Sequence, residues 1–432
     1  LAPSSHCRRA RSGRSSIPRG KTLPLRAGRD LEPVVRPRNQ NSRMSRYRLA
    51  PTAAQETVLL RHCGDARFVW NLAVEQHSHW RPGLKSAPRY LEQCRQLTCA
   101  RADNPWLSQG SQMVQQQSLR DFDQAVRNFF AGTHRKPTWR KARRDEGFRI
   151  VAVKPERIRK LNRNRAEVLV PKCGWVRFRL SRAVPDGVKS FRANRDTAGR
   201  WHVAFAAIPE PVPGPDTGEV IGIDRGVAVT LALSDGHTYR APAPASVARL
   251  QRKLARAKRG SSRRLKVRQQ LARAQARNAD ARKDWAEKSS TDIARRYDVI
   301  RIEDLKVRNM TRSAWGSAEA PGRGVQQKAG LNRSILASAW SLFATRLEDK
   351  AAGRVEKINP AYTSQTCSQC KVIDREARES QAVFRCRACG YCGNADVNAA
   401  RNIAAGHAVT ARGRSPLGGR LNREPQLGLL AS

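Results

Sequence analysis

The spacing of hydrophobic residues predicts a helical segment early in the chain. Thr52 and Gln55 form a capping-box pattern, in which each side chain can accept a hydrogen bond from a free backbone N–H group at a helix start. Apolar residues then recur every three or four positions up to Trp70, and a second run with the same period begins at Leu119. We therefore expect residues 51–140 to be mostly helical.

Beyond this segment the hydrophobic period shortens to two residues. Val176, Phe178 and Leu180 alternate with arginines, which is typical of a strand with one buried face. Residues 141–215 are therefore predicted to form a small antiparallel sheet or β-barrel. The outward arginines are either a phosphate-binding surface or an ordinary solvated face. A proline-rich stretch at 209–218 is expected to be a linker.

The second half of the chain predicts a unit of mixed strands and helices. Residues 219–236 are two apolar runs joined by a tight turn that contains Asp224, and residues 299–305 are a third predicted strand. Between them, the basic segment 247–297 predicts two helices separated by a glycine and serine break. A strand hairpin, helices, a strand with an acidic residue and a helix led by Asp396 follow the order of an RNase H-like nuclease core.

The charge of the chain indicates the class of its partner. It has 83 Lys and Arg residues against 36 Asp and Glu residues, a net charge of +47. Such an excess favours a polyanion, and no apolar run approaches the roughly 20 residues of a membrane-spanning helix. Nucleic acid is therefore the expected partner, and a membrane is not. A ribosome-like basic surface, the alternative interpretation, also implies RNA.

Residues 1–43 differ in composition from the rest of the chain. They carry eleven Lys or Arg residues against two acidic residues and show no hydrophobic period, so we expect a disordered basic extension. The first methionine is Met44, which leaves open whether this extension belongs to the native product. The Gly- and Arg-rich residues 407–432 are also expected to be disordered.

Two Cys-x2-Cys pairs predict a structural zinc site. Cys367 and Cys370 are separated by fifteen residues from Cys386 and Cys389, a spacing that lets two tight turns surround one Zn²⁺ with four thiolates. Cys392 is an alternative to Cys389 as the fourth ligand, although the paired spacing favours Cys389. Ten cysteines without a secretion signal indicate a reducing, cytoplasmic compartment.

Three acidic residues are the candidates for catalysis. Hard Mg²⁺ ions need carboxylate oxygens that converge from separate elements, and two such ions can together hydrolyse a phosphodiester. Asp224, Glu303 and Asp396 each lie at or near the end of a predicted element. Each also has a structural interpretation: Asp224 as a turn former, Glu303 as the exposed face of an edge strand with Asp304 as the ligand instead, and Asp396 as a helix N-cap.

Several ordered motifs resemble a known protein family. The segments IGIDRGV, IRIEDLKVRNM, QKAGLNRSI, NPAYTSQTCSQC and CRACGYCGNADVNAARNI are similar to the TnpB or OrfB proteins of insertion sequences, which are relatives of the compact type V CRISPR nucleases. The N-terminal segment YRLAPTAAQETVLLRHCGDARFVWNLAVEQ resembles the opening segment of that family. The similarity extends from Tyr47 to Ala405.

The resemblance implies an RNA-guided, Mg-dependent, RuvC-like endonuclease. Such a protein carries a guide RNA transcribed from its own element's end and cuts double-stranded target DNA beside a short flanking motif. By position, the three acidic residues match the family's metal-binding, catalytic carboxylates, and the two cysteine pairs match its zinc ligands. Lys371, where glycine commonly follows the second ligand, and Cys392 depart from the family pattern, so the shape of the ribbon is left open.

The resemblance also implies the architecture. We expect a multidomain α+β and α/β protein: an RNase H-like (RuvC) nuclease core with an inserted zinc ribbon, a helical recognition segment and a small β-barrel. The recognition segment would be inserted into the barrel. The expected boundaries are 44–50 and 141–215 for the barrel, 216–362 for the nuclease core, 363–392 for the ribbon and 393–406 for the last RuvC-like segment.

Two functions of other classes are alternatives to RNA-guided cutting. One is a nuclease-dead, RNA-guided DNA-binding repressor, against which the intact acidic triad argues. The other is a transposase that joins DNA strands itself, because RNase H-like transposases also use three acidic residues. For all three candidate functions we expect a monomer that associates with the nucleoid.

Overall fold

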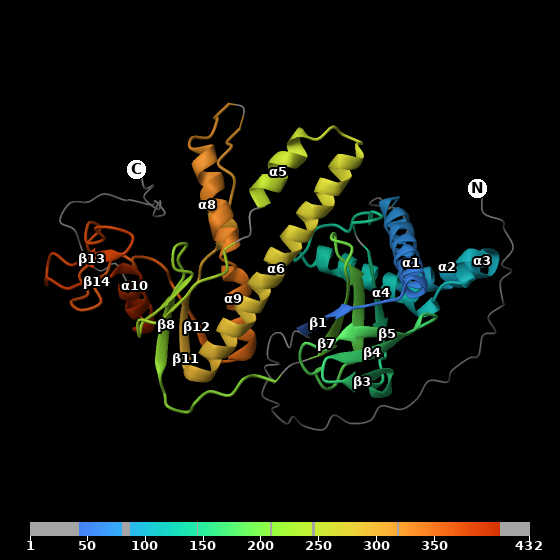
Figure 1. The fold of residues 1–432 in the computed structure, drawn as a ribbon, viewed down its shortest axis with the longest axis horizontal. Helices are drawn as coiled ribbons and strands as arrows, with labels where there is room; N and C mark the ends of the chain where they lie inside the picture. Colours follow the sequence, from blue (N-terminus) through green and yellow to red (C-terminus); the bar gives the residue numbers. More distant parts are fainter. Residues whose placement is uncertain are drawn as a thin grey trace, which may run out of the picture. The chain divides into compact units, whose positions relative to one another are not determined.

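The computed structural model describes most of the chain between residues 43 and 406 (Figure 1). The described ranges are 43–79, 87–144, 146–207, 210–243, 247–317 and 319–406. The disorder expected for residues 1–43 and 407–432 therefore concerns positions that, except for Arg43, lie outside the described residues.

The predicted helical segment is present and begins at the predicted cap. Its helices are α1 Ala53–Ser78, α2 Tyr90–Asp103, α3 Pro105–Ser108 and α4 Gln112–Phe130. The Thr52 side chain accepts a hydrogen bond from the Gln55 backbone, and the Gln55 side chain accepts one from the Thr52 backbone, which confirms the capping box. Trp70 of α1 and Phe122 of α4 meet edge to face with ring centroids 5.4 Å apart in a helical core. The earlier apolar residues Leu59, Cys63 and Ala66 of α1 pack instead into the core of the first sheet.

The first sheet is antiparallel and has seven strands in the order β2-β6-β7-β1-β5-β4-β3. Their bounds are β1 Arg43–Leu49, β2 Gly147–Val151, β3 Ile158–Asn162, β4 Arg165–Val170, β5 Gly174–Arg179, β6 Ser190–Arg195 and β7 Trp201–Ala207, with a short 3-10 helix at Pro155–Arg157. Tyr47, Phe178 and Phe205 meet at its centre. The edge strands β2 and β3 do not pair within the described residues, so the closed barrel is not confirmed.

One outward arginine of this sheet has an internal partner. In β5, Val176 and Phe178 are buried while Arg177 is exposed, as the alternation predicts. Arg177 and Arg159 both bind the carboxylate of the buried Glu167, at 3.1 and 2.7 Å. These two arginines therefore neutralise an acidic residue of the sheet, although their side chains are also exposed to solvent.

The second sheet has five strands in the order β10-β9-β8-β11-β12. The strands are β8 Val220–Asp224, β9 Leu231–Leu233, β10 Thr238–Tyr239, β11 Val299–Glu303 and β12 Val355–Ile358. Strands β8, β9 and β10 are antiparallel neighbours, whereas β8, β11 and β12 are parallel. The hairpin predicted around Asp224 is thus present, and the strand predicted at 299–305 lies in the interior of the sheet.

Helices pack on both faces of this sheet. The helices of this half of the chain are α5 Val247–Arg256, α6 Ser262–Arg296, α7 Val307–Met310, α8 Val325–Ala337, α9 Trp340–Lys350 and α10 Ala395–Ala404. Of these, α6, α9 and α10 cover the sheet. On one face, Ile223 and Ile302 form a buried cluster with Phe343 of α9 and Ile293 of α6. On the other face, α10 lies so close to β8 that a Cβ at Gly222 would be 2.1 Å from the Ala400 carbonyl oxygen, so this position requires glycine.

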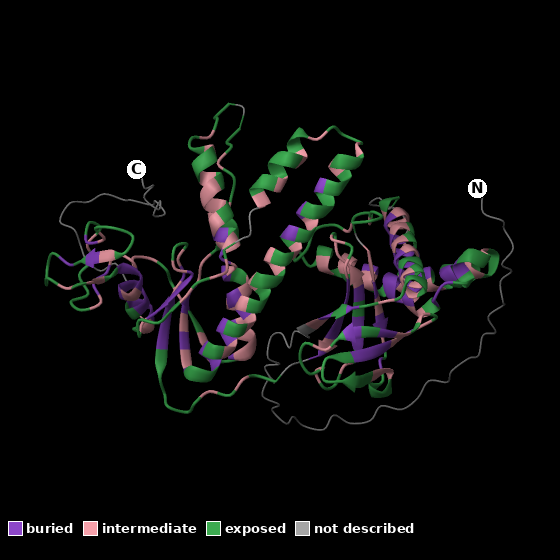
Figure 2. Cartoon of the chain, viewed as in Figure 1, coloured by how far each residue is buried: buried purple, intermediate pink, exposed green. Residues whose placement is uncertain are grey.

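Burial differs strongly between elements (Figure 2). Strands β8 and β11 are largely buried, whereas α5 has no buried residue and α8 has one, Ile335. Residues 359–394 form mostly turns around a two-stranded ribbon of β13 Val383–Arg385 and β14 Cys392–Asn394, in which Phe384 is fully buried.

His202 in β7 makes the stability of the first sheet sensitive to acid. Burial lowers the pKa of His202 to about 4, because the charged ring would lose its hydration. The unfolded chain titrates near pH 6.5, so stability is complete above that pH and falls as the pH drops, by about 2 kcal/mol at pH 5. Thermal melts between pH 7.5 and 5 should show a smaller acid loss for His202→Gln than for wild type. Equal losses in both proteins would contradict this.

Candidate metal centres

Two of the three candidate carboxylates lie at the same edge of the five-stranded sheet. Strands β8 and β11 are parallel, with Ile223 opposite Ile302, so Asp224 and Glu303 occupy the next position on each strand. Adjacent strands lie about 4.8 Å apart, and side chains alternate between the two faces. Since Ile223 and Ile302 point toward α6 and α9, Asp224 and Glu303 both point to the face covered by α10.

Helix α10 brings the third acidic residue to this face. Asp396 lies in the first turn of α10, and its Oδ2 is 3.9 Å from the place that a Cβ would occupy at Gly226, two residues after Asp224. The N-cap of α10 is Asn394, whose side-chain oxygen accepts hydrogen bonds from the backbone of Asp396 and Val397. The N-cap interpretation of Asp396 is therefore wrong.

The structure also distinguishes Glu303 from the adjacent Asp304 as a candidate metal ligand. Glu303 is 7% exposed in an interior strand, so the edge-strand interpretation is wrong. Asp304 is less buried, and its carboxylate binds the Lys306 ammonium at 2.5 Å. Of this pair, only Glu303 is buried on the face that Asp224 also occupies.

The three carboxylates interact electrostatically. Burial, followed by the charges of Glu303 and Asp396, raises the pKa of Asp224 well above its usual value. Burial likewise raises the pKa of Glu303. Placing like charges together in a poorly solvated site is unfavourable, and a bound cation would relieve that cost. These three residues are therefore the ones that could hold a divalent metal ion through carboxylate oxygens.

Three further residues contact this acidic group. The Thr363 hydroxyl donates to Glu303 Oε1 at 2.8 Å, and Arg378 Nη2 donates to Asp396 Oδ1 at 3.0 Å. The guanidinium of Arg225, which is 6% exposed, donates to the Glu303 carbonyl oxygen. We did not expect these residues to take part. Arg225 directly follows Asp224, which was a usable signal, but no spacing connects Arg378 or Thr363 to distant acidic residues.

The four predicted zinc ligands converge. The Sγ atoms of Cys367, Cys370, Cys386 and Cys389 all lie within 4.8 Å of one another, and Cys392 is not in this group. Backbone N–H groups of Cys389 and Ala388 lower the pKa of Cys386 to about 7, which favours the thiolate that a metal binds. These four residues would hold Zn²⁺ in a closed, structural geometry.

The two cysteine turns have the same backbone conformation. In the first, Lys371 N–H donates to the Cys367 carbonyl with φ of +63°, and in the second, Gly390 N–H donates to the Cys386 carbonyl with φ of +74°. Lys371 thus replaces the expected glycine while keeping the left-handed conformation that glycine adopts most easily. Lys371 therefore adopts a conformation that glycine would adopt with less backbone strain.

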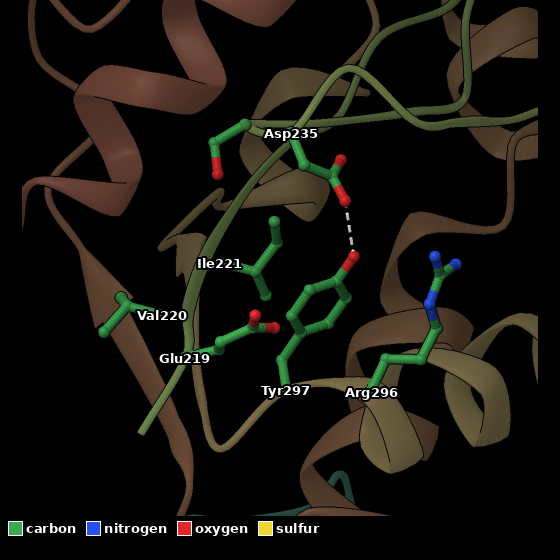
Figure 3. Close-up of a pocket in the computed structure, with 7 residues that line it drawn as sticks. Glu219, Val220, Ile221, Asp235, Arg296 and Tyr297 are labelled. Atoms are coloured by element: carbon green, nitrogen blue, oxygen red, sulfur yellow. Dashed lines mark hydrogen bonds between the residues drawn. The ribbon is translucent and has the colours of Figure 1, made fainter. Parts of the chain in front are cut away.

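A separate pocket lies at the opposite end of β8 (Figure 3). It has a volume of about 560 Å³ and is lined by Glu219, Asp235, Arg296 and Tyr297 among others, with the Tyr297 hydroxyl donating to Asp235 Oδ2 at 2.5 Å. Because β8 rises about 3.3 Å per residue, this pocket is separate from the acidic edge.

Three family models match the chain. A model of IS605 OrfB proteins, described as "Probable transposase", matches residues 203–314, and a Cas12f1-like TNB domain model matches 340–403. A helix-turn-helix domain model of the same OrfB group matches 42–82, where the described residues form β1 and the single long helix α1.

Comparison with individual proteins decides the family. The chain is 36% identical over 398 residues to an Escherichia coli K12 protein named "Putative RNA-guided DNA endonuclease InsQ", covering 88% of this chain and 96% of that protein. The chain belongs to the TnpB/OrfB family of IS605-type elements. This TnpB/OrfB protein is also 30% identical to a Streptomyces pristinaespiralis protein with the same functional description, over 87% of this chain and 92% of its relative.

More distant matches of this TnpB/OrfB protein are CRISPR nucleases. It is 32% identical over 223 residues to a CRISPR-associated endodeoxyribonuclease Cas12f1 of Sulfoacidibacillus thermotolerans, covering 48% of this chain and 51% of that one. A cryo-EM structure of a Cas12f1-sgRNA-target DNA complex matches with a TM-score of 0.47 and 14% identity, over 81% of this chain and 82% of that chain. Among the described residues, no helix has the length and apolarity to cross a membrane.

Removing the metal should unfold the ribbon selectively. Its described residues bury few apolar side chains, among them Phe384 and Ala377, so metal binding should supply most of its folding free energy. Cys370→Ser should release zinc and raise amide hydrogen exchange across residues 363–394 while leaving β8 and β11 protected. Cys392→Ser is the matched control and should keep one zinc per chain. Loss of zinc from both variants would contradict the assignment of Cys389.

Proposed function

We propose that this protein is an RNA-guided DNA endonuclease that cuts double-stranded DNA by metal-dependent phosphodiester hydrolysis. The observation that carries the proposal is the position of Asp224, Glu303 and Asp396 on one face of one sheet edge. The names of the E. coli and Streptomyces relatives support the same activity. The net charge of +47 fits a protein that holds two nucleic acids.

The proposed core is RNase H-like, of the RuvC type. Its strand order β10-β9-β8-β11-β12 has three antiparallel strands followed by two parallel ones, and the acidic residues come from β8, β11 and a helix packed on them. The same order of elements, a hairpin, helices, a strand with an acidic residue and a helix led by Asp396, was the basis in the sequence for proposing this core. We further propose that residues 44–50 and 141–215 together form the wedge-like barrel of the family around the recognition segment.

The proposed mechanism assigns each side chain a task. Asp224, Glu303 and Asp396 would hold two Mg²⁺ ions, and the chemistry supplied by such ions would be activation of water and stabilisation of the charge on the phosphate. Thr363 fixes the Glu303 carboxylate by hydrogen bonding. Arg378 lies within hydrogen-bond distance of Asp396, from where its guanidinium can contact the scissile phosphate once a cation occupies the carboxylates.

Sequence choice would come from base pairing and not from the protein. A basic protein can hold an RNA and DNA heteroduplex through its backbone, while the guide specifies the target and the protein reads only a short flanking motif. We propose that the guide is transcribed from the end of the protein's own element. The abundance of arginine without a base-reading motif supports this division of tasks.

Substitution of the acidic residues tests the catalytic assignment. Asp224→Ala and Glu303→Gln should each reduce plasmid cutting by about 10²–10⁴-fold, because a metal ion contributes several kcal/mol of charge stabilisation in the transition state. Asp304→Asn is the matched control and should cut at nearly the wild-type rate. The assay uses the protein purified with its co-transcribed RNA, Mg²⁺ and a plasmid with a matching target and a randomised flank.

Other outcomes of this assay separate the alternatives. If wild type binds the target but cuts under no flank, the protein is a repressor of the nuclease-dead type. If strand-transfer products form without added RNA, the protein is a transposase that joins strands itself. Equal loss of cutting in Asp304→Asn and Glu303→Gln would contradict the choice of Glu303.

A further inference from the structure

A basic segment projects from the edge of the sheet that carries the acidic residues. This segment, described at residues 306–317 and 319–337, comprises α7, a loop and α8 and is called the basic arm below (Figure 1). It starts three residues after Glu303. It ends just before Trp340, whose ring N–H donates at 3.2 Å to the carbonyl of Gly226, in the turn after Asp224. Both ends of the arm are therefore attached beside the candidate catalytic carboxylates.

The arm is held together by side chains of α8. Lys328 Nζ donates to the Met310 carbonyl at 2.8 Å, and Asn332 Nδ2 donates to the carbonyls of Thr311 and Arg312 at 3.1 and 3.2 Å. With 13 residues, α8 is about 20 Å long. The loop before α8 is thus presented about 20 Å from the acidic edge, in a defined position relative to it.

The loop exposes a tryptophan on a closely packed backbone. Trp315 is 76% exposed, while its carbonyl accepts a hydrogen bond from Gly322 N–H at 3.0 Å. A Cβ at Gly322 would be 1.5 Å from the Ala314 carbonyl oxygen, and one at Gly316 would be 2.1 Å from that of Ala320. Both glycines are required by this backbone, so the exposure of Trp315 is a property of the loop as built.

The charge of the arm selects a polyanionic partner. The arm contains six Lys or Arg residues and one acidic residue, Glu319. Four of its arginines are exposed and form no salt bridge with any other described residue: Arg308, Arg312, Arg323 and Arg333. A second copy of this chain would repel such a surface. An exposed aromatic ring among arginines is the combination that binds unpaired bases and their phosphates, because bases stack on the ring whatever their sequence.

We propose that the basic arm binds single-stranded DNA, with one base stacked on Trp315 and the phosphates contacting the arginines. This rests on the proposed function and deepens it: the arm holds the strand that is to be cut and directs it toward Asp224, Glu303 and Asp396. A span of about 20 Å corresponds to about six stacked nucleotides. The stacked base therefore lies within about six nucleotides of the scissile phosphate.

Photo-crosslinking tests this without requiring any cutting. The full chain with its guide RNA, carrying Asp224→Ala so that DNA stays intact, is irradiated with single-stranded DNA that contains 5-iodouracil. Trypsin cuts after Arg312 and Arg323 and releases a peptide in which Trp315 is the only aromatic residue. We expect the DNA adduct on this peptide, its loss in Trp315→Ala, and its partial retention in Trp315→Phe. Leu336→Ala removes an exposed apolar side chain of the same arm and should keep the adduct.

Kinetics on the active protein give an independent measurement. Trp315→Ala should raise KM for single-stranded DNA by about 5- to 150-fold, the range for loss of one stacked base, with kcat and the melting temperature close to wild type. The proposal would be overturned if the DNA adducts lay on other peptides and formed with the same yield in wild type and in Trp315→Ala. Preferential cross-linking of a 5-iodouracil RNA to the Trp315 peptide would also overturn it. The arm would then be a binding site for the guide RNA. If the adduct forms but wild type never cuts, the proposed function fails and the arm remains a DNA-binding surface.

Discussion

The parallel pairing of β8 with β11 is the constraint on which the rest of the candidate site depends. This register sets Asp224 beside Glu303 and turns both side chains to one face. A shift of one residue in either strand would turn one carboxylate into the Ile223 and Phe343 core, where a charge has no partner. The hydrophobic face of the sheet therefore fixes the geometry of its polar edge.

The zinc ribbon and the acidic edge are mechanically connected. Asn398 and Asn402 of α10 donate to the Thr366 carbonyl at 2.8 and 2.6 Å, and Asn402 also donates to the Thr363 carbonyl at 3.1 Å. Thr363 in turn holds Glu303, while Arg378 binds Asp396. The segment that carries the four converging cysteines thus supplies contacts to two of the three carboxylates. Both asparagines are buried, so these hydrogen bonds are protected from competition by water.

Charge is distributed so that some arginines serve the fold and others stay available. Arg387 binds Asp374 and Glu376 within the ribbon, and Arg385 binds Glu379. These internal pairs make both arginines stabilisers of the ribbon first. The arginines of the basic arm lack such pairs among the described residues. Net charge predicted a polyanionic partner but could not separate these two groups, because pairing is a property of the folded chain.

Local sequence determined the features that depend on neighbouring residues. The capping box at Thr52, the hairpin around Asp224, the break between α5 and α6 and the cysteine pairs follow from short-range spacing, which a chain keeps wherever it folds. Sequence motifs also predicted the family correctly. The converging thiols include Cys389 and not Cys392, as the paired spacing had favoured. The burial of Glu303 in an interior strand was decided by tertiary structure. Thr363 and Arg378 contact the carboxylates only because distant segments meet, and no local period records such a meeting.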